Sequence, residues 1–241
     1  MRRLLEAVVF TVLVYVATVV LQIYQPVTGG YFNLGESMIY LAAMVSNPIV
    51  AALAGGVGSS LADLSTGYAI FAPATFIIKF TEGYLAGLLI GLFRRTRRKA
   101  FAAASVGAVY ALGLYYGISY WAGVVEFGPS SWLGINFSSS TLELPWYGWL
   151  LVTVILGAIV VYGVSKYVVK SLEPIALLVA GSLMVAGYFL YEYFVSNPLT
   201  GRPPINALYE VPVNIGQAVA GVIISLPIAV WLYRAGFIKE S

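Results

Sequence analysis

The 241-residue sequence contains no cysteine and no histidine. Without cysteine, the chain can form no disulfide, thiolate nucleophile or cysteine-based metal site. Without histidine, it lacks the commonest metal ligand and the usual general base of enzymes. No G-x-x-x-x-G-K-[ST] loop occurs, so this chain does not hydrolyse ATP itself. These absences argue against an enzyme and predict no bound cofactor.

Charged residues are also scarce. They make up 10% of the chain, whereas hydrophobic residues make up 60%; an ordinary soluble domain carries about 25% charged residues. Apolar runs near the roughly 20 residues needed to span a bilayer recur along the whole sequence. The sequence therefore predicts an all-α integral membrane protein, with one transmembrane domain over residues 1–241.

The apolar segments predict about eight transmembrane helices. The region 36–62 could cross the membrane once, or twice with a break at Ser46-Asn47-Pro48, because proline disfavours helix in the residue before it. We favour two short helices there, for the reason of orientation given next. The other predicted spans are 4–23, 73–93, 100–122, 147–169, 174–194 and 208–233.

A basic run sets the predicted orientation. Arg94, Arg95, Arg97, Arg98 and Lys99 follow one another closely, and such a run beside a membrane span is typical of the cytoplasmic side. With the N-terminus in the cytoplasm, the basic run also lies in the cytoplasm only if the region 36–62 crosses the membrane twice. We therefore expect a multi-pass protein of the cell membrane with both termini in the cytoplasm. Nucleic acid is a poor explanation of a basic run in such a chain, so we expect no nucleic-acid partner.

Several polar side chains fall inside the predicted spans, all in the outer half of the membrane. At about 1.5 Å of rise per residue, Lys79 and Asp63 lie about 9 Å below the outer surface. Tyr188 and Asn214 reach the same level, Glu82 and Gln217 lie one turn deeper, and Glu36, Glu192 and Glu210 sit near the outer rim.

These polar groups have two interpretations. A charge in the membrane costs about 2.5–3.5 kcal/mol, so such groups should face one another or a watery cavity. Lys79 could form a structural ion pair with Asp63 or Glu82, and amide side chains could join helices by hydrogen bonds. Alternatively the groups line an outward-facing pocket, where Asn214 and Gln217 could bind the edges of a heterocycle.

Small residues recur every four positions in three rows. The rows are Ala51, Gly55 and Ser59; Ala54, Gly58 and Ala62; and Gly83, Gly87 and Gly91. Rows of this kind let helix backbones approach closely. They predict close packing within the chain, or docking of a partner membrane protein.

Two regions carry ordered motifs. The first contains Gly30-Tyr31-Phe32-Asn33-Leu34-Gly35-Glu36, then Ala54-Gly55-Gly56-Val57-Gly58-Ser59-Ser60-Leu61-Ala62-Asp63 and Gly67-Tyr68-Ala69-Ile70-Phe71-Ala72-Pro73-Ala74-Thr75, with Lys79, Glu82 and Gly83 after them. The second contains Met184-Val185-Ala186-Gly187-Tyr188-Phe189-Leu190-Tyr191-Glu192 and Glu210-Val211-Pro212-Val213-Asn214-Ile215-Gly216-Gln217. Together they resemble the S components of energy-coupling factor (ECF) transporters, in the riboflavin-type branch.

The resemblance implies a six-helix bundle that binds a vitamin from the outside with high affinity. It implies as partners a membrane coupling protein and two ATPase subunits. The loop after the first helix, around Gly29–Gly35, is similar to a lid over the pocket in that family. Because the family has six helices, residues 100–170 are expected to be an inserted pair of spans.

The implied substrate is a small flat vitamin, riboflavin or a related pyrimidine or pyridine. The aromatic side chains expected to stack on it are Tyr31, Phe32, Tyr68, Phe71 and Tyr188. The candidate binding residues are Asn33, Glu36, Asp63, Tyr68, Lys79, Glu82, Tyr188, Glu192, Asn214 and Gln217. The alternatives are a stand-alone proton- or ion-coupled carrier with Asp63 and Glu82 as its relay, and an intramembrane enzyme.

Overall fold

The computed structural model describes residues 2–25, 27–93, 99–138, 140–166 and 173–237. Within them the main helices are α1 (Arg2–Val20), α2 (Gly35–Val45), α3 (Pro48–Ser65), α4 (Ala72–Phe93), α5 (Lys99–Trp121), α6 (Trp146–Lys166), α7 (Glu173–Tyr191) and α9 (Ala207–Arg234). A π-helical turn, η1 (Glu192–Ser196), joins α7 to the short helix α8 (Asn197–Leu199). A 3₁₀ turn, η2 (Pro204–Asn206), precedes α9.

The helices confirm the predicted all-α membrane fold. In the described part of the chain, five segments are long and apolar enough to cross a membrane: α1, α3, α4, Glu173–Leu199 and Pro204–Arg234. Shorter apolar helical segments are Gly35–Val45, Ala104–Ser119 and Trp146–Ile155. Large apolar side chains on α1, such as Leu5 and Val12, are exposed, as expected for a surface that faces lipid.

The predicted break at residues 46–48 is confirmed. Helix α2 ends at Val45 and α3 begins at Pro48. Asn47 caps α3, because its side-chain oxygen accepts hydrogen bonds from the backbone N–H groups of Ile49 (3.1 Å) and Val50 (3.2 Å). Proline is well placed at the first position of a helix, where its missing N–H would have no partner.

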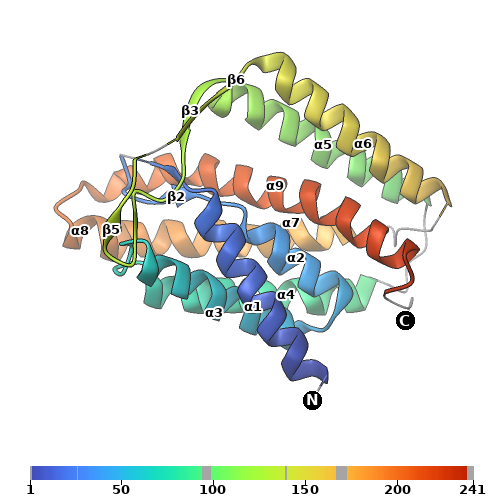
Figure 1. Ribbon diagram of the computed structural model, residues 1–241, viewed down its shortest axis with the longest axis horizontal. Coiled ribbons are helices and arrows are strands. Elements are labelled where there is room, and N and C mark those ends of the chain that lie inside the picture. The colour runs from blue at the N-terminus through green and yellow to red at the C-terminus, as the bar shows by residue number, and fades with distance from the viewer. Residues whose placement is uncertain (1, 26, 94–98, 139, 167–172, 238–241) are drawn as a thin grey trace.

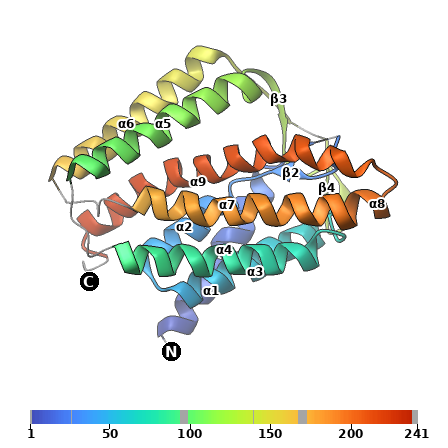
Figure 2. The same ribbon diagram turned by 180° about the vertical axis from the view of Figure 1, so that it is seen from behind.

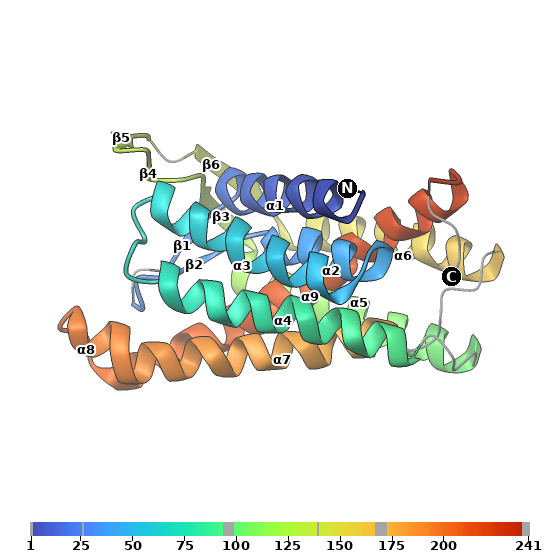
Figure 3. The same ribbon diagram turned by 90° about the horizontal axis from the view of Figure 1, so that it is seen from below.

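Helices α2, α3, α4, α7 and α9 pack into one bundle, and α1 crosses over α3 and α2. The α5–α6 pair forms a separate hairpin that lies along α9, as Figures 1 and 2 show from opposite sides. Helix α1 begins and α9 ends toward one end of the bundle, while α8 and the strands lie at the other (Figures 1 and 3). The basic stretch 94–98, Lys170 and Lys239, on which the predicted orientation depends, lie outside the described residues.

The connection between α5 and α6 contains strands that the sequence analysis did not predict. Strand β3 (Gly123–Phe127) pairs antiparallel with β6 (Ser140–Leu144), and β4 (Ser131–Trp132) pairs with β5 (Ile135–Asn136). Near α1, β1 (Ile23–Tyr24) pairs with β2 (Tyr31–Phe32). These pairings give hydrogen-bond partners to backbone N–H and C=O groups of the loops at the α8 end of the bundle. The prediction that residues 100–170 are an insertion stays a prediction.

Glycines bring α3 and α4 into close contact. A methyl group on Gly83 would overlap the backbone carbonyl of Ala51, and one on Gly55 would lie 2.7 Å from the carbonyl oxygen of Lys79. On Gly87 it would lie 2.6 Å from the Cα of Pro48. Three of the predicted small-residue positions therefore serve packing within the chain. Gly91 differs, because a methyl group there meets no atom within 4 Å.

We expect Gly83→Ala to lower the free energy of unfolding by about 1–3 kcal/mol, because backbone atoms would have to move apart. Gly91→Ala is the matched control; it should leave stability unchanged or raise it by up to about 1 kcal/mol, since alanine favours helix. Thermal denaturation of the purified variants in detergent measures both. Equal melting temperatures for the two variants would contradict this account of the α3–α4 contact.

Candidate ligand-binding site

A cavity lies inside the bundle toward the α8 end. It is lined by Thr18, Gly30, Tyr31, Asn33, Ser59, Asp63, Phe71, Thr75, Lys79, Tyr188, Glu192, Glu210, Asn214 and Gln217. These residues come from α1, the loop between α1 and α2, α3, the α3–α4 connection, α4, α7, η1 and α9. Its volume is about 30 Å³, which is room for about two water molecules.

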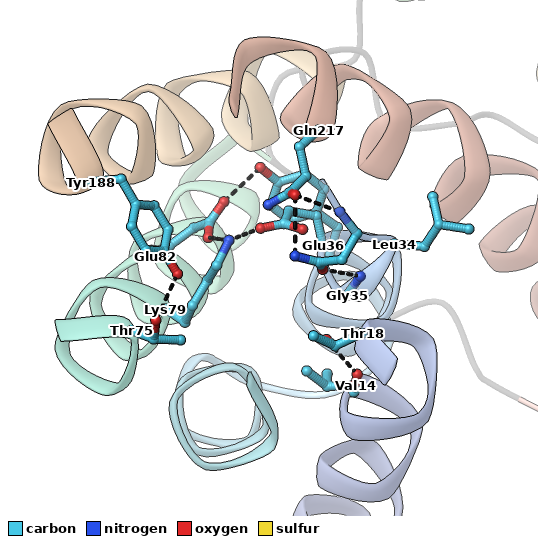
Figure 4. A network of polar contacts seen from close by, with 12 residues as sticks. Val14, Thr18, Leu34, Gly35, Glu36, Thr75, Lys79, Glu82, Tyr188 and Gln217 are labelled. Carbon is cyan, nitrogen blue, oxygen red and sulfur yellow. Dashed lines mark hydrogen bonds and ion pairs between the residues drawn. The ribbon is translucent and has the colours of Figure 1, made fainter. Parts of the chain in front are cut away.

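Lys79 is the centre of a buried ionic network. Its ammonium group pairs with Glu36 of α2 and lies 3.4 Å from an oxygen of Glu82, one turn along α4 (Figure 4). The hydroxyl of Tyr40 donates a hydrogen bond of 2.8 Å to the other oxygen of Glu82. All four side chains are buried. The network therefore joins α2 to α4 beneath the cavity and holds one positive charge between two carboxylates.

Gln217 fixes the end of the loop that precedes α2. Its side-chain oxygen accepts hydrogen bonds from the backbone N–H (2.8 Å) and the side-chain amide (3.1 Å) of Asn33. The side-chain oxygen of Asn33 in turn accepts from the backbone N–H of Gly35, at 2.8 Å (Figure 4). A methyl group on Gly35 would overlap the hydroxyl of Thr18, so glycine is required where α2 starts against α1.

Two tyrosines of the loops cover the cavity. Tyr31 donates a hydrogen bond of 2.6 Å to Asp63, and its ring lies 4.4 Å from the ring of Tyr68. Burial, reinforced by the negative charge of Asp63, raises the pKa of Tyr31 well above its usual value. Burial likewise raises the pKa of Tyr68 to about 12. Both phenols therefore keep their protons at any physiological pH, and Tyr31 donates its proton in the hydrogen bond to Asp63.

Tyr68 faces an outer depression with a volume of about 330 Å³, which also includes Tyr24, Phe71, Ser130 and Arg202. Phe71 borders both this depression and the inner cavity. The tilted ring pair of Tyr31 and Tyr68 thus lies between the two spaces.

Two further carboxyl groups lie on the α8 side of the cavity. Glu192 begins η1 and Glu210 lies in the first turn of α9, close enough to interact electrostatically. Thr28 donates a short hydrogen bond to one oxygen of Glu210. One oxygen of Glu192, Oε2, is buried without a hydrogen-bond partner among the described residues. Asn214, one turn after Glu210, is 5% exposed and also lines the cavity.

The structure brings most of the predicted site residues together. Those that line the cavity are Asn33, Asp63, Lys79, Tyr188, Glu192, Asn214 and Gln217. Glu36 and Glu82 lie behind Lys79, and Tyr68 lies in the outer depression. The predicted depth of Glu36 was wrong, because it is not at the rim but contacts Lys79. The loop before α2 enters the bundle, where Asn33 contacts Gln217, so α2 starts inside the bundle and has only 11 residues.

The sequence analysis did not include Glu210, Thr28, Thr75 or Thr18 among the binding residues. Thr75 accepts a hydrogen bond of 3.1 Å from Tyr188 and lies one turn before Lys79 on the same face of α4. The four-residue spacing between Thr75 and Lys79 was the signal in the sequence that could have identified Thr75 as a site residue. Nothing in the sequence indicated that Thr28 binds Glu210, which lies 182 residues away.

A second cavity, of about 240 Å³, lies between α9 and the α5–α6 hairpin. Its lining is almost entirely apolar and includes Phe32, Leu144, Trp149 and Ile223. Because it offers few polar groups to bind the edges of a heterocycle, we take the first cavity as the candidate site.

Comparisons with known proteins agree with the transmembrane architecture. A family model described as "ECF-type riboflavin transporter, S component" matches residues 2–128. A curated protein of Pyrococcus woesei, named "Uncharacterized protein in gap 3'region", is 46% identical over 74 residues, or 31% of this chain and 49% of that protein. The match thus spans about half the length of that relative. No solved structure matches the chain.

Proposed function

The chain belongs to the family of S components of ECF-type riboflavin transporters, and we propose that it captures a small flat vitamin from outside the cell for uptake. The candidate ligands are riboflavin and related pyrimidine or pyridine vitamins. In this role the chain binds and releases its ligand unchanged and is not an enzyme. It is a multi-pass protein of the cell membrane, and both of its termini lie in the cytoplasm.

The observation that carries the proposal is the buried polar cavity at one end of the bundle. Amide, hydroxyl and charged groups from several separate segments converge there, and aromatic side chains lie beside them. Binding sites for small molecules combine an enclosed, mostly apolar wall with a few fixed polar groups. The position toward the α8 end, opposite the start of α1, fits an entrance on the outer side.

The ligand enters through the outer depression and displaces the Tyr31–Tyr68 pair. The inner cavity of about 30 Å³ is far smaller than a vitamin, whereas the depression of about 330 Å³ is of suitable size. Pockets for small ligands are typically about 300–1,000 Å³. The loop that carries Tyr31 therefore moves outward when the ligand binds, while Gln217 holds its inner end.

Partners supply the energy for uptake. The sequence contains no ATP-binding loop, and membership of the family implies that a membrane coupling protein and two ATPase subunits drive the transport cycle. If instead the chain were a stand-alone carrier, Asp63 and Glu82 would be its relay. Glu82 is held by Lys79 and Tyr40, which leaves it poorly placed to exchange protons with solvent.

Mass spectrometry of small molecules released when the purified protein is denatured tests this function, together with binding measurements on a panel of vitamins. We expect one vitamin at about one molecule per chain. A protein that releases no vitamin and binds none of the panel contradicts the proposal. Uptake by this chain alone, abolished by an uncoupler and independent of ATP, would instead identify a carrier.

A further inference from the structure

The charges around the cavity are strongly unbalanced. Asp63, Glu192 and Glu210 line it, and Lys79 is the one basic residue among the described residues that do. Two more carboxylates, Glu36 and Glu82, bind that same ammonium group. Five carboxyl groups therefore line or adjoin a cavity that contains a single basic side chain, in a buried part of the protein.

Lys79 cannot balance the three carboxyl groups that line the cavity, because its own two partners already exceed its charge. One oxygen of Asp63 accepts a hydrogen bond from a neutral donor, the hydroxyl of Tyr31, and one oxygen of Glu210 accepts from the hydroxyl of Thr28. Arg202 lies in the outer depression and donates a hydrogen bond of 3.0 Å to Thr200. A buried charge is stable only when it is paired or strongly hydrogen-bonded, so these carboxyl groups suit a positive partner.

The cavity also offers aromatic faces to a cation. Tyr31, Phe71 and Tyr188 line it beside the carboxyl groups. The ammonium group of Lys79 already lies over the ring of Tyr188, 5.4 Å from its centroid. Aromatic rings attract cations through their electron-rich faces, and cages of such rings bind quaternary ammonium ligands.

Two buried polar groups independently indicate that a ligand completes this site. The Oε2 atom of Glu192 and the Oδ2 atom of Asp63 have no hydrogen-bond partner among the described residues, although both residues are more than nine-tenths buried and line the cavity. Buried polar groups are nearly always hydrogen-bonded. Ligand donor groups near Glu192 and Asp63 would satisfy both.

We infer that the ligand of this site is a flat heterocycle with a positive charge, bound between aromatic rings and opposite Glu192 and Glu210. This inference rests on the proposed function and narrows it. Among the candidate vitamins it favours pyrimidine or pyridine compounds with a cationic ring over the neutral ring of riboflavin.

Binding of a charge series to the purified full-length protein tests the inference. Nicotinate, nicotinamide and 1-methylnicotinamide share one ring and differ in charge, from negative through neutral to positive. Riboflavin and thiamine add a larger neutral and a larger cationic compound. We expect 1-methylnicotinamide to bind about ten- to hundredfold more tightly than nicotinamide, and thiamine to bind more tightly than riboflavin by a similar factor. This is the range for a hydrogen-bonded contact with a charged group.

Glu192→Gln and Glu210→Gln test the residues responsible. Each keeps the size of the side chain and its acceptor oxygen but removes the charge, so affinity for cations should fall about tenfold or more relative to affinity for neutral compounds. Glu143→Gln, which removes an exposed negative charge on β6, is the matched control and should change neither. Thermal denaturation of each variant beside the parent protein shows that the variant is folded.

The outcomes separate the inference from the proposed function. Tight binding of riboflavin in preference to every cation, or glutamine variants that keep full affinity for cations, would overturn the positive-ligand inference and leave vitamin binding intact. Failure of all compounds and of the wider vitamin panel would overturn both. Loss of the preference for cations in Glu143→Gln as well would show that the effect is general electrostatics and not this site.

Discussion

Replacing Lys79 with methionine should lower the free energy of unfolding by about 3–5 kcal/mol, the range for breaking a buried ion pair by removing one partner. Methionine matches the length of lysine but leaves the carboxylates of Glu36 and Glu82 facing each other without a cation. Tyr40 donates to Glu82 only. Loss of the ion pairs also disturbs the wall of the cavity that Lys79 lines, so ligand binding should fall as well.

Thermal denaturation and ligand binding of Lys79→Met, measured beside Arg202→Met, check this expectation. Arg202 is a partly exposed cation with a single hydrogen bond, to Thr200, so its replacement should change stability by less than about 1 kcal/mol. A Lys79→Met protein as stable as the Arg202→Met protein would contradict the ionic network.

A double variant separates the two roles of Lys79. Glu36→Gln with Lys79→Met removes one negative and one positive charge, and should recover part of the lost stability because only Glu82 remains charged. If Lys79 also binds the ligand, affinity stays low in the double variant although the protein is stable again. Recovery of stability and of affinity together would assign Lys79 a purely structural role, which was one of the two interpretations that the sequence left open.

The helices were predictable because their signals are local. Apolar runs of suitable length marked the spans, and Ser46-Asn47-Pro48 carried both a helix cap and a residue that starts a new helix. The common depth of the polar side chains was predictable for residues in regular helices, because the constant rise per residue fixes the depth of each residue along its helix. Asp63, Lys79, Tyr188 and Asn214 accordingly reach one cavity.

The loops could not be predicted in the same way. The depth of Glu36 depends on how far the preceding loop enters the bundle, and that path is fixed by contacts with Gln217 and Thr18, far away in sequence. The β3–β6 hairpin likewise depends on pairing across an intervening segment. Which carboxylates pair with Lys79 also depends on the tertiary structure. The sequence suggested Asp63 or Glu82, whereas the structure pairs Lys79 with Glu36 as well as Glu82. The excess of carboxyl groups over basic groups around the cavity becomes evident only when this pairing is known.

Gln217→Leu should produce the other large effect. Leucine removes the acceptor of two buried donors of Asn33 at once, and each unsatisfied buried group costs about 1–3 kcal/mol. We expect a loss of stability of about 2–5 kcal/mol, unless the loop opens and lets water reach these donors. In that case stability falls less, but the loop no longer covers the cavity and ligand affinity falls at least about tenfold.

Gln22→Leu is a matched control for Gln217→Leu, since both glutamines are 2% exposed and belong to or contact the same loop. Gln22 donates one hydrogen bond of 3.2 Å, to Thr66, and its own oxygen has no partner among the described residues. Its replacement removes a weak contact together with an unsatisfied oxygen, so its net effect should stay below about 1 kcal/mol. Hydrogen–deuterium exchange across residues 28–36 distinguishes the two variants, because only loss of Gln217 frees the backbone N–H of Asn33. Equal exchange in both variants would mean that the loop is held by other contacts, and the outward movement proposed for ligand entry would then need a different hinge.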